Sequence, residues 1–243
     1  MHSIIVFADG ACTGNPGPGG WGAIIASPQG EVVELGGAER DTTNNKMELT
    51  AVGKALRFLA DTKGPVEIYT DSTYVIHGIT KWIWGWRKKG WKTSEGKDVA
   101  NAEYWKSLSN LLSRRDSDSP VSWHYVRGHS GVPGNERVDE IAVAFAKGSR
   151  IQLYQGPLLK YDVAVFDLPE DTEPPEPRAR EKPSAPFSYL SLVGNTVERH
   201  STWKDCERRV KGVSGAKFKK CMNQEEEAGV LKSWGIKDLG NKK

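Results

Sequence analysis

The chain has 243 residues, of which 34 are Lys or Arg and 31 are Asp or Glu, so its formal net charge is +3. This length exceeds one average domain, and a hydrophobic content of 37% is sufficient for a modest core without covalent cross-links. The three cysteines are odd in number and widely spaced, which argues against a disulfide framework and favours a reducing compartment. The sequence has neither the pattern of a signal peptide nor that of a membrane span, so we expect a cytoplasmic protein without a membrane partner.

The first part of the chain predicts a mixture of strands and helices. Runs of β-branched and aromatic residues indicate strands at 3–9, 20–27 and 31–37, which glycine and proline turns join into an antiparallel meander. The elements expected next, in chain order, are a helix at about 44–60, a strand near 66–70, helices near 72–88 and 101–114, a strand near 121–126 and a helix at about 135–147. Because crossover connections are right-handed, the two later strands should lie parallel to the first. This order predicts an α/β fold with a mixed five-stranded sheet flanked by helices.

Charge and proline content divide the chain further. Residues 1–150 hold 18 basic and 17 acidic residues, whereas residues 187–243 hold 12 and 7, a net charge of +5. Between them, residues 167–186 contain six prolines with 3 basic and 6 acidic residues, which is typical of an extended, partly polyproline linker. We therefore expect a first domain at 1–150, an extension and linker at 151–186, and a small α+β domain at 187–243. An ordered surface loop is the alternative for the linker, although a structureless segment of this length is rare in a compact domain.

Four acidic residues lie where such a fold places its chemistry. Asp9 and Asp71 each close a short predicted strand, whereas Glu48 and Asp139 each lie near the start of a predicted helix. Open α/β sheets bind ligands at the carboxyl ends of their strands, and helix starts can reach the same edge. We expect the four carboxylates to converge in one cleft. The alternative is that each of them is a separate surface charge or helix cap, which is reasonable for one acid and much less so for all four.

A convergent set of carboxylates needs a counter-charge. Two like charges about 4 Å apart repel by roughly 4 kcal/mol at an effective dielectric constant near 20. Oxygen ligands without an accompanying Cys and His cluster favour Mg²⁺ or Mn²⁺ over zinc, and Mg²⁺ held by a few carboxylates usually acts on a phosphate. The four acids therefore predict metal-assisted phosphoryl transfer.

A segment rich in aromatic and basic residues follows the predicted strand near 66–70, which Asp71 closes. Its tryptophans and cations are Trp82, Trp84, Trp86 and Trp91 with Arg87, Lys88, Lys89 and Lys92. Such side chains together pack on sugars and neutralise phosphates, which predicts a surface for nucleic acid. Some of these tryptophans must also belong to the core, and we expect Trp84 or Trp91 to be structural.

Glycines, asparagines and one histidine add to this picture. The glycines after the first strand allow a nucleic-acid backbone to approach, and nearby asparagines can bond a 2′-hydroxyl, although for the glycines simple turn formation is an equal alternative. His129 lies in a glycine-rich loop ten residues before Asp139. A titratable group there could move protons or assist product departure, and the alternative is an ordinary surface or core histidine.

Five segments within the first 150 residues resemble the type 1 ribonucleases H, in the order in which that family carries them. They are DGACTGNPGPGGWG, TTNNKMEL, TDSTYV, GITKWIWGWRKKGWKTSEG and VRGHSGVPGNERVDEIA. The resemblance implies a ribonuclease H fold and a nuclease that cuts the RNA strand of an RNA–DNA hybrid. It also implies that Asp9, Glu48, Asp71 and Asp139 are the catalytic, metal-binding carboxylates and that His129 is the mobile catalytic histidine.

The same resemblance assigns residues to substrate binding. Thr43 and Asn101 match a pocket that grips a DNA phosphate, and Trp82 and Trp86 match positions that line the groove for the DNA strand. The full set expected to contact the hybrid is Cys12, Asn15, Thr43, Asn44, Asn45, Trp82, Trp86, Lys88, Lys89 and Asn101. One departure is Asp41, which stands where many family members have Arg two residues before the threonine.

Residues 187–235 resemble a second module, the hybrid-binding or viroplasmin domain that many eukaryotic enzymes of this family carry at the N-terminus. The match rests on Tyr189, on TWKDC and on GAKFKK, and it departs from the usual pattern at Cys221, where an aromatic residue is common. The residues expected to hold a hybrid through its minor groove are Tyr189, Trp203, Phe218, Lys219 and Lys220. Double-stranded RNA is a second candidate partner. The alternative is that the two large aromatic residues form a small core and the lysines are solvated.

These assignments predict an endonuclease with two Mg²⁺ ions per active site, for which Mn²⁺ can substitute, that leaves 5′-phosphate and 3′-hydroxyl ends. One ion is expected on Asp9, Asp71 and Asp139, and the other on Asp9 and Glu48. The alternatives are another nuclease of the same fold, such as an integrase or resolvase, and a non-catalytic protein that binds hybrid or double-stranded RNA. We expect the protein to be a monomer.

Overall fold

The computed structural model describes residues 3–175 and 186–236. The chain divides into two compact units, Met1–Pro177 and Arg178–Lys243, each with a sheet and a core of its own. No helix in the described ranges is long and apolar enough to cross a bilayer.

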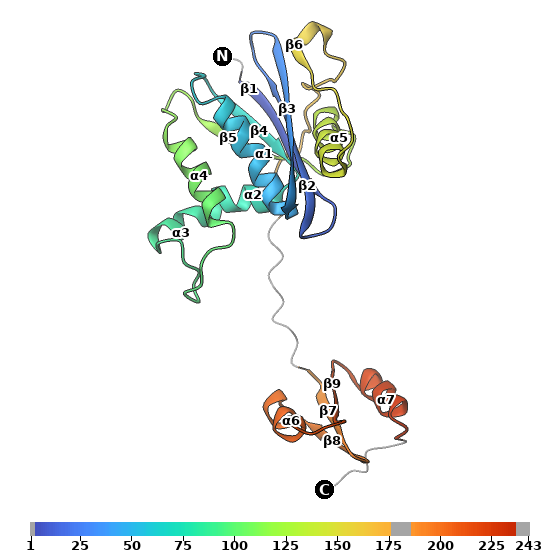
Figure 1. Cartoon of the computed structure of the whole chain (residues 1–243). Coiled ribbons are helices and arrows are strands. Elements are labelled where there is room, and N and C mark those ends of the chain that lie inside the picture. The colour runs from blue at the N-terminus through green and yellow to red at the C-terminus, as the bar shows by residue number, and fades with distance from the viewer. Residues whose placement is uncertain (1–2, 176–185, 237–243) are drawn as a thin grey trace. The chain divides into compact units, whose positions relative to one another are not determined.

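A six-stranded mixed sheet organises the first unit, and its strand order is β5-β4-β1-β2-β3-β6 (Figure 1). The strands are β1 (Ile4–Cys12), β2 (Gly17–Ala26), β3 (Glu31–Thr42), β4 (Val66–Thr70), β5 (Val121–Tyr125) and β6 (Gln155–Pro157). The first three form the predicted antiparallel meander, and β4 and β5 lie parallel to β1 as predicted. Their carboxyl ends therefore share one edge of the sheet. The predicted α/β class is confirmed.

Helices cover both faces of this sheet. The helices of the first unit are α1 (Asn44–Phe58), α2 (Thr73–His77), α3 (Ile83–Lys88), α4 (Ala102–Ser113) and α5 (Pro133–Lys147). One face packs against α1 and α4 and the other against α5, because alternate residues of β1 point into two separate apolar clusters (Figure 1). The predicted helix at 72–88 is one helical stretch with a wider π turn at Gly78–Trp82 between α2 and α3.

Gly78 explains why this turn lies so close to α4. A Cβ atom at position 78 would lie 2.0 Å from the indole of Trp105, which is fully buried in α4. Only glycine allows the two helices to approach this far without displacing the ring.

The extension, residues 151–175, differs from the prediction. It was expected to lie outside the first domain, and its last part was expected to be linker, but β6 pairs with β3 and Val165 is buried in the core under α5. Three residues of β6 therefore add a sixth strand to the five that were predicted. The segment's apolar residues are spaced irregularly among prolines and acids, so neither helical nor strand periodicity marked it. The first compact unit therefore continues about 25 residues beyond residue 150 within the described chain.

The second unit is a small three-stranded sheet with two helices. Its elements are β7 (Ser188–Val193), β8 (Thr196–His200), α6 (Trp203–Val210), β9 (Lys217–Cys221) and α7 (Gln224–Ser233), with sheet order β8-β7-β9. Leu190, Cys221 and Leu231 form its core. Glu227 is buried beside them, where it pairs with Arg199 and accepts a hydrogen bond from Ser188. The predicted α+β class of this part is confirmed.

Candidate active site

Asp9 and Asp71 lie side by side at the carboxyl ends of neighbouring parallel strands. Asp9 lies within β1 and Asp71 directly follows β4, and the register that aligns Phe7 with Tyr69 places the two acids level with each other. Asp9 is only 7% exposed, and its Oδ1 accepts a hydrogen bond from the Gly10 amide at 2.7 Å. This buried pair of acids is the base of the site.

Glu48 reaches the same place from α1. Thr43 caps this helix by accepting a hydrogen bond from the Lys46 amide, which fixes where the helix begins. Glu48 then accepts hydrogen bonds from Asn44 Nδ2 at 2.9 Å and from the Ser72 hydroxyl. Close packing of α1 against β1 requires Gly10, because a Cβ there would lie 2.3 Å from the backbone nitrogen of Glu48.

Asp139 and His129 come from the segment that follows β5. Asp139 lies on α5, and its charge acts on both Asp9 and Asp71. The buried Asn135, one turn earlier on α5, donates a hydrogen bond to Asp71. His129 is exposed on the loop before α5, with a left-handed backbone at φ 52°, and its charge also acts on Asp71.

The electrostatics show that these carboxylates lie close to one another. Burial, and then the charge of Asp71, raise the pKa of Asp9 to about 8, with smaller contributions from Asp139 and Glu48. The pKa of Asp71 is raised by burial and then by Asp139, and the pKa of Glu48 is raised by burial despite its hydrogen bond from Ser72. Within the described ranges the charge of His129 acts against this repulsion at Asp71, but the pKa of Asp71 stays raised.

The donor set fits hard divalent cations, since it consists of carboxylate oxygens, and the pKa is raised for three of these groups, Asp9, Glu48 and Asp71. In the described ranges, no three acidic, His or Cys side chains surround one point as closely as a formed metal site requires. The hydrogen bonds of Glu48 to Asn44 and Ser72 give a reason, because they hold this carboxylate by its neighbours on α1 and before α2.

The tryptophans beyond Asp71 form an aromatic row. The ring centroids of Trp82 and Trp86 are 5.7 Å apart, and those of Trp86 and the buried Trp105 are 5.5 Å apart. Lys88 and Lys89 are exposed at the end of α3. Of the two tryptophans considered structural, Trp91 packs against the core, whereas Trp84 is 60% exposed. The row thus joins the core to a basic surface.

The remaining expected substrate residues lie at loops and helix starts. Asn101 is the residue before α4, with a left-handed backbone, and donates a hydrogen bond to the Tyr74 hydroxyl at 3.1 Å. Asn15 and Asn45 are exposed, while the Cys12 thiol lies 3.5 Å from the Thr42 carbonyl oxygen. Their contacts with a substrate stay predictions.

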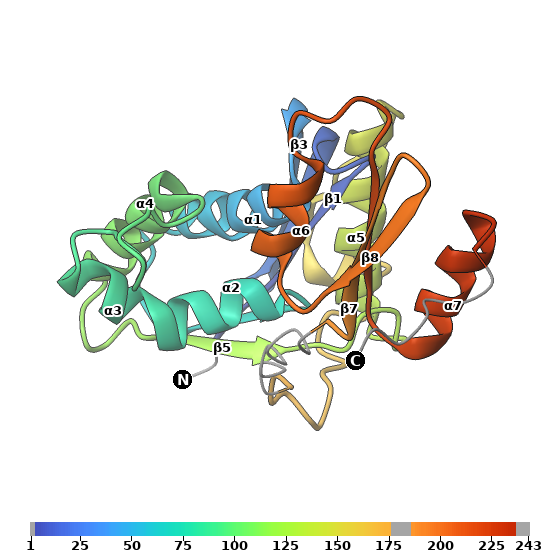
Figure 2. The ribbon, with the colours of Figure 1, turned by 90° about the horizontal axis from the view of Figure 1, so that it is seen from below.

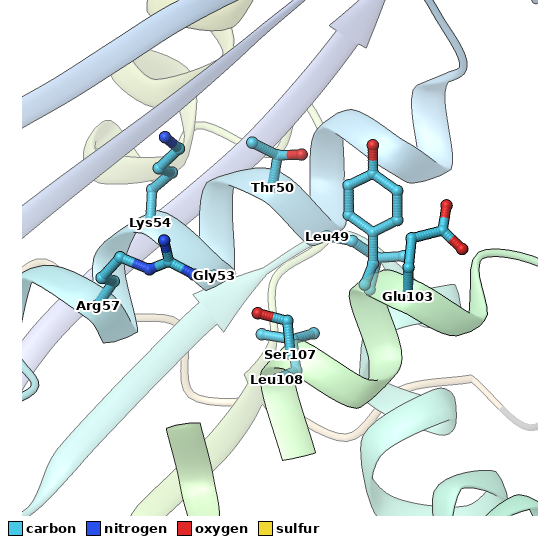
Figure 3. Close-up of a pocket in the computed structure, with 9 residues that line it drawn as sticks. Leu49, Thr50, Gly53, Lys54, Arg57, Glu103, Ser107 and Leu108 are labelled. Carbon is cyan, nitrogen blue, oxygen red and sulfur yellow. The ribbon is translucent and has the colours of Figure 1, made fainter. Parts of the chain in front are cut away.

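A separate pocket lies between α1 and α4, away from the four acids. It has a volume of about 270 Å³, and Figure 3 shows Lys54 and Arg57 at one side and Glu103 at the other. Tyr104 also lines the pocket. Thr50, Gly53, Ser107 and two buried leucines complete its lining. None of the predicted site residues lines it.

An aromatic cluster faces solvent in the second unit. The Trp203 ring lies 5.8 Å from the ring of Tyr189 and 5.2 Å from that of Phe218, measured between centroids. Trp203 and Phe218 are 39% and 54% exposed, so they are not the core of this unit. Lys219 and Lys220 follow Phe218 on β9 and are exposed. The pairing of β9 with β7 places Phe218 and Lys220 on the face of the sheet that carries Tyr189 and Trp203, whereas Lys219 pairs with the core residue Leu190 and alternates to the other face.

Sequence reasoning missed the residues that position these acids. Ser72 and Asn135 were not singled out, and neither was Gly10, although Ser72 directly follows Asp71 and caps α2. A serine at that place is a recognisable helix-start signal. The hydrogen bond of Asn135 to Asp71 had no such signal, because it joins segments 64 residues apart in the sequence.

Two family models match the chain. Residues 1–147 match the family described as RNase H, and residues 193–234 match the family described as Ribonuclease H1 N-terminal domain. A protein named Ribonuclease H from Cyanothece is 52% identical over 151 residues, which cover 62% of this chain and 93% of that protein. One from Agrobacterium fabrum is 53% identical over 144 residues, which cover 58% of this chain and 93% of that protein.

Solved structures agree with these matches. The crystal structure of LC9-RNase H1, described as a type 1 RNase H with the type 2 active-site motif, is 32% identical with a TM-score of 0.53. That match covers 64% of this chain and 79% of the other. Because the first family model spans more than half of the chain and relatives near 50% identity are covered almost completely, the chain belongs to the RNase H family, with an RNase H1 N-terminal-type domain near its C-terminal end.

Proposed function

We propose that this protein is an endonuclease that hydrolyses the RNA strand of RNA–DNA hybrids through Asp9, Glu48, Asp71 and Asp139. One observation supports this most directly: at the shared carboxyl edge of β1 and β4 the buried Asp9 carboxylate lies within the field of Asp71, Asp139 and Glu48, whose charges raise its pKa. A site of this charge binds neutral ligands weakly and favours divalent cations, which in turn bind the phosphate of a substrate. The relatives named Ribonuclease H support the reaction class.

Each residue has a proposed task. Two Mg²⁺ ions, when bound, would activate water and stabilise the leaving 3′-oxygen, so that the products carry 5′-phosphate and 3′-hydroxyl ends. Asp9 is shared between both sites, Asp71 and Asp139 complete the first, and Glu48 completes the second. Asn135 and Ser72 hold two of these carboxylates in place. His129, on its exposed loop, moves a proton or assists product departure.

Strand choice follows from two different surfaces. Asn44 donates a hydrogen bond to Glu48, Asn15 lies in an exposed turn and Asn45 is exposed in the first turn of α1. Amide groups at these places suit the 2′-hydroxyls of RNA. The row of Trp82 and Trp86 with the lysines after it suits the sugar and phosphates of the DNA strand. A duplex with one strand of each kind satisfies both surfaces.

The second unit is proposed to hold the hybrid while the first unit cuts it. The solvent-facing cluster of Tyr189, Trp203 and Phe218 with two adjacent lysines offers stacking and phosphate contacts without a sequence code. Double-stranded RNA has the same wide minor groove on which these contacts depend. Competition between hybrid and double-stranded RNA for the protein therefore tests whether the unit is specific for hybrids or binds A-form duplexes in general.

Asp9→Asn tests the assignment, with Asp61→Asn as the matched control, because Asp61 is an exposed acid at the far end of α1. We expect Asp9→Asn to lower kcat with Mg²⁺ by at least about 10³-fold while the Kd for hybrid changes less than about threefold. Asp61→Asn should leave both unchanged. Residual activity above a few per cent would contradict the site. Cleavage of duplex DNA at a comparable rate would favour another nuclease of this fold, and binding without any cleavage would favour the non-catalytic alternative.

A further inference from the structure

The extension, residues 151–175, has no place in either family match, since one ends at residue 147 and the other begins at 193. It nevertheless packs against the first unit along its whole described length. We propose that the extension braces the 126–132 loop, which carries His129, and thereby positions this histidine and Asp139. The inference rests on the roles proposed above for those two residues.

The first attachment holds the start of α5 through a buried acid. The Glu34 side chain is completely buried in β3 and accepts hydrogen bonds from Arg137 Nε at 2.7 Å and from the Tyr161 hydroxyl at 2.6 Å. It also accepts one from the Tyr154 amide at 2.9 Å. Arg137 lies two residues before Asp139 on α5. Tyr154 and Tyr161 of the extension thus hold Glu34, the carboxylate with which this arginine pairs.

The second attachment is apolar. Val165 is 1% exposed and belongs to the core cluster that also contains Val126 and Val138. Val132 packs against the same cluster. Val126 and Val132 are the two ends of the His129 loop, and Val138 is next to Asp139. One side chain of the extension thus shares a core with both ends of the loop and with the helix after it.

The third attachment is at the end of β5. The Tyr125 amide, directly before the loop, donates a hydrogen bond to the Thr172 carbonyl oxygen at 2.8 Å. The Pro175 carbonyl oxygen lies 3.1 Å from His77 Nε2 on α2, which packs beside β5 (Figure 2). The extension therefore secures the strand before the loop as well as the helix after it.

These attachments matter because the loop itself has little to hold it. Arg127, His129, Ser130 and Gly131 are exposed, and Gly128 and Gly131 add backbone freedom. Fixing both ends of a short loop lowers the number of conformations in which His129 lies away from Asp71. The brace thus acts on kcat rather than on binding of the hybrid.

The test is Val165→Ala in the full chain, with Val66→Ala and Phe166→Ala as controls. Val66 is fully buried at the opposite end of β4 from Asp71, in the other core, whereas Phe166 is half exposed on the extension. We expect Val165→Ala to lower kcat on short saturating hybrid about three- to tenfold with KM unchanged, well below the unfolding temperature of each variant. Amide hydrogen exchange in residues 127–131 should become about tenfold faster in Val165→Ala alone.

A double-mutant cycle separates the brace from general damage. In a His129→Ala background, Val165→Ala should lower kcat by a smaller factor than in the wild type, because one of the two groups that it positions is gone and only the effect on Asp139 is left. Unchanged hydrogen exchange in the loop, or an equal loss of kcat in Val66→Ala, would overturn the brace. Full activity of His129→Ala alone would overturn the proposed role of the histidine instead, and the exchange measurement would still decide whether the extension holds the loop.

Discussion

At Asp9, folding and the proposed catalysis favour opposite protonation states of the carboxyl group. A cation site requires the ionised carboxylate, yet burial and three neighbouring acids raise the pKa of this group to about 8. Without divalent ions the folded protein therefore holds a proton at neutral pH that the unfolded chain, with a pKa of 3.8, has released. Binding of a cation removes this conflict and should stabilise the fold.

Asp9→Asn should consequently make the protein more stable than the wild type in EDTA, increasingly so as pH rises. A raised pKa favours folding fully below about pH 4, and this contribution is lost as pH rises toward 8. We expect the difference in free energy of unfolding between the two proteins to grow by about 1–3 kcal/mol from pH 5.5 to pH 8.5, measured by urea titration. Asp61→Asn should show no such trend, and Mg²⁺ should reduce the difference. Parallel pH curves for wild type and Asp9→Asn would contradict it.

Single residues also show what a sequence can and cannot predict about a site. The four acids were predictable because each is attached to a strand end or a helix start, and the sheet topology then brings these points together. Their repulsion was expected once they converge, but the hydrogen bonds that orient them are visible only in the structure. The contacts of Asn135 with Asp71 and of Arg137 with Glu34 depend on helix and sheet packing between distant segments, which no local pattern encodes.

Among the elements, the helical stretch from α2 to α3 contains Gly78, a residue with low helix propensity, at the point where the helix packs closely against α4. Gly78 lies within the π turn that lets the chain pass the Trp105 ring, and that ring supports Trp86 and hence the aromatic row. The sequence predicted one helix here, and its length was right. The wider turn was not predictable, because it results from packing against α4 rather than from local preference.

Gly78→Ala and Gly85→Ala form a matched pair within this stretch. The added methyl group at 78 would lie 2.0 Å from the Trp105 ring, whereas nothing lies within 4 Å of one at 85 in α3. We expect Gly78→Ala to lower the free energy of unfolding by about 1–3 kcal/mol or more, and Gly85→Ala to raise it by about 0.5–1 kcal/mol. Chemical denaturation of both variants measures this. Equal stabilities would show that the ring can move aside without cost.

The extension is the element that sequence patterns described least well. The acids and prolines of its last part predicted a linker, and the acids there, Asp167, Glu170, Asp171 and Glu173, are exposed. Three inward contacts, made by Tyr161, Val165 and Thr172, nonetheless attach it to the first unit. Each is separated from the next by several exposed residues, so the segment has no periodicity that would indicate a strand or a helix.

At the scale of the whole molecule, two units for which different tasks are proposed share one chain. The last described residue of the first unit, Pro175, lies against His77, whose ring is 5.9 Å from that of Trp82 between centroids. The connection to the second unit therefore starts beside the aromatic row proposed for the DNA strand. Only residues 176–185 lie between the described parts, which limits the distance between their ends to about 40 Å. A short tether gives a high effective concentration of bound hybrid at the nuclease.

Removing the aromatic cluster of the second unit should consequently raise KM without changing the chemistry. We expect Trp203→Ala with Phe218→Ala to increase KM on long hybrid at low salt by about tenfold or more and to reduce the number of cuts per encounter. On short saturating substrate kcat should stay unchanged, because the four acids and their supports lie in the other unit. The increase in KM should become smaller as the salt concentration rises. Contacts with phosphates release counterions and so weaken in salt, and the stacking contacts that depend on them weaken too.

Phe187→Ala is the matched control for that prediction. Phe187 is 47% exposed in the same unit, but it lies under the guanidinium of Arg199 rather than in the aromatic cluster. Initial rates on long and short hybrids at two salt concentrations, for both variants and the wild type, measure the contribution of the cluster. If the double variant and Phe187→Ala behaved alike on long hybrid at low salt, the cluster would not be the hybrid contact. If the double variant lost activity on hybrid only when double-stranded RNA was present as a competitor, the cluster would bind A-form duplexes in general. The lysines of β9 would then contribute to affinity rather than to selectivity.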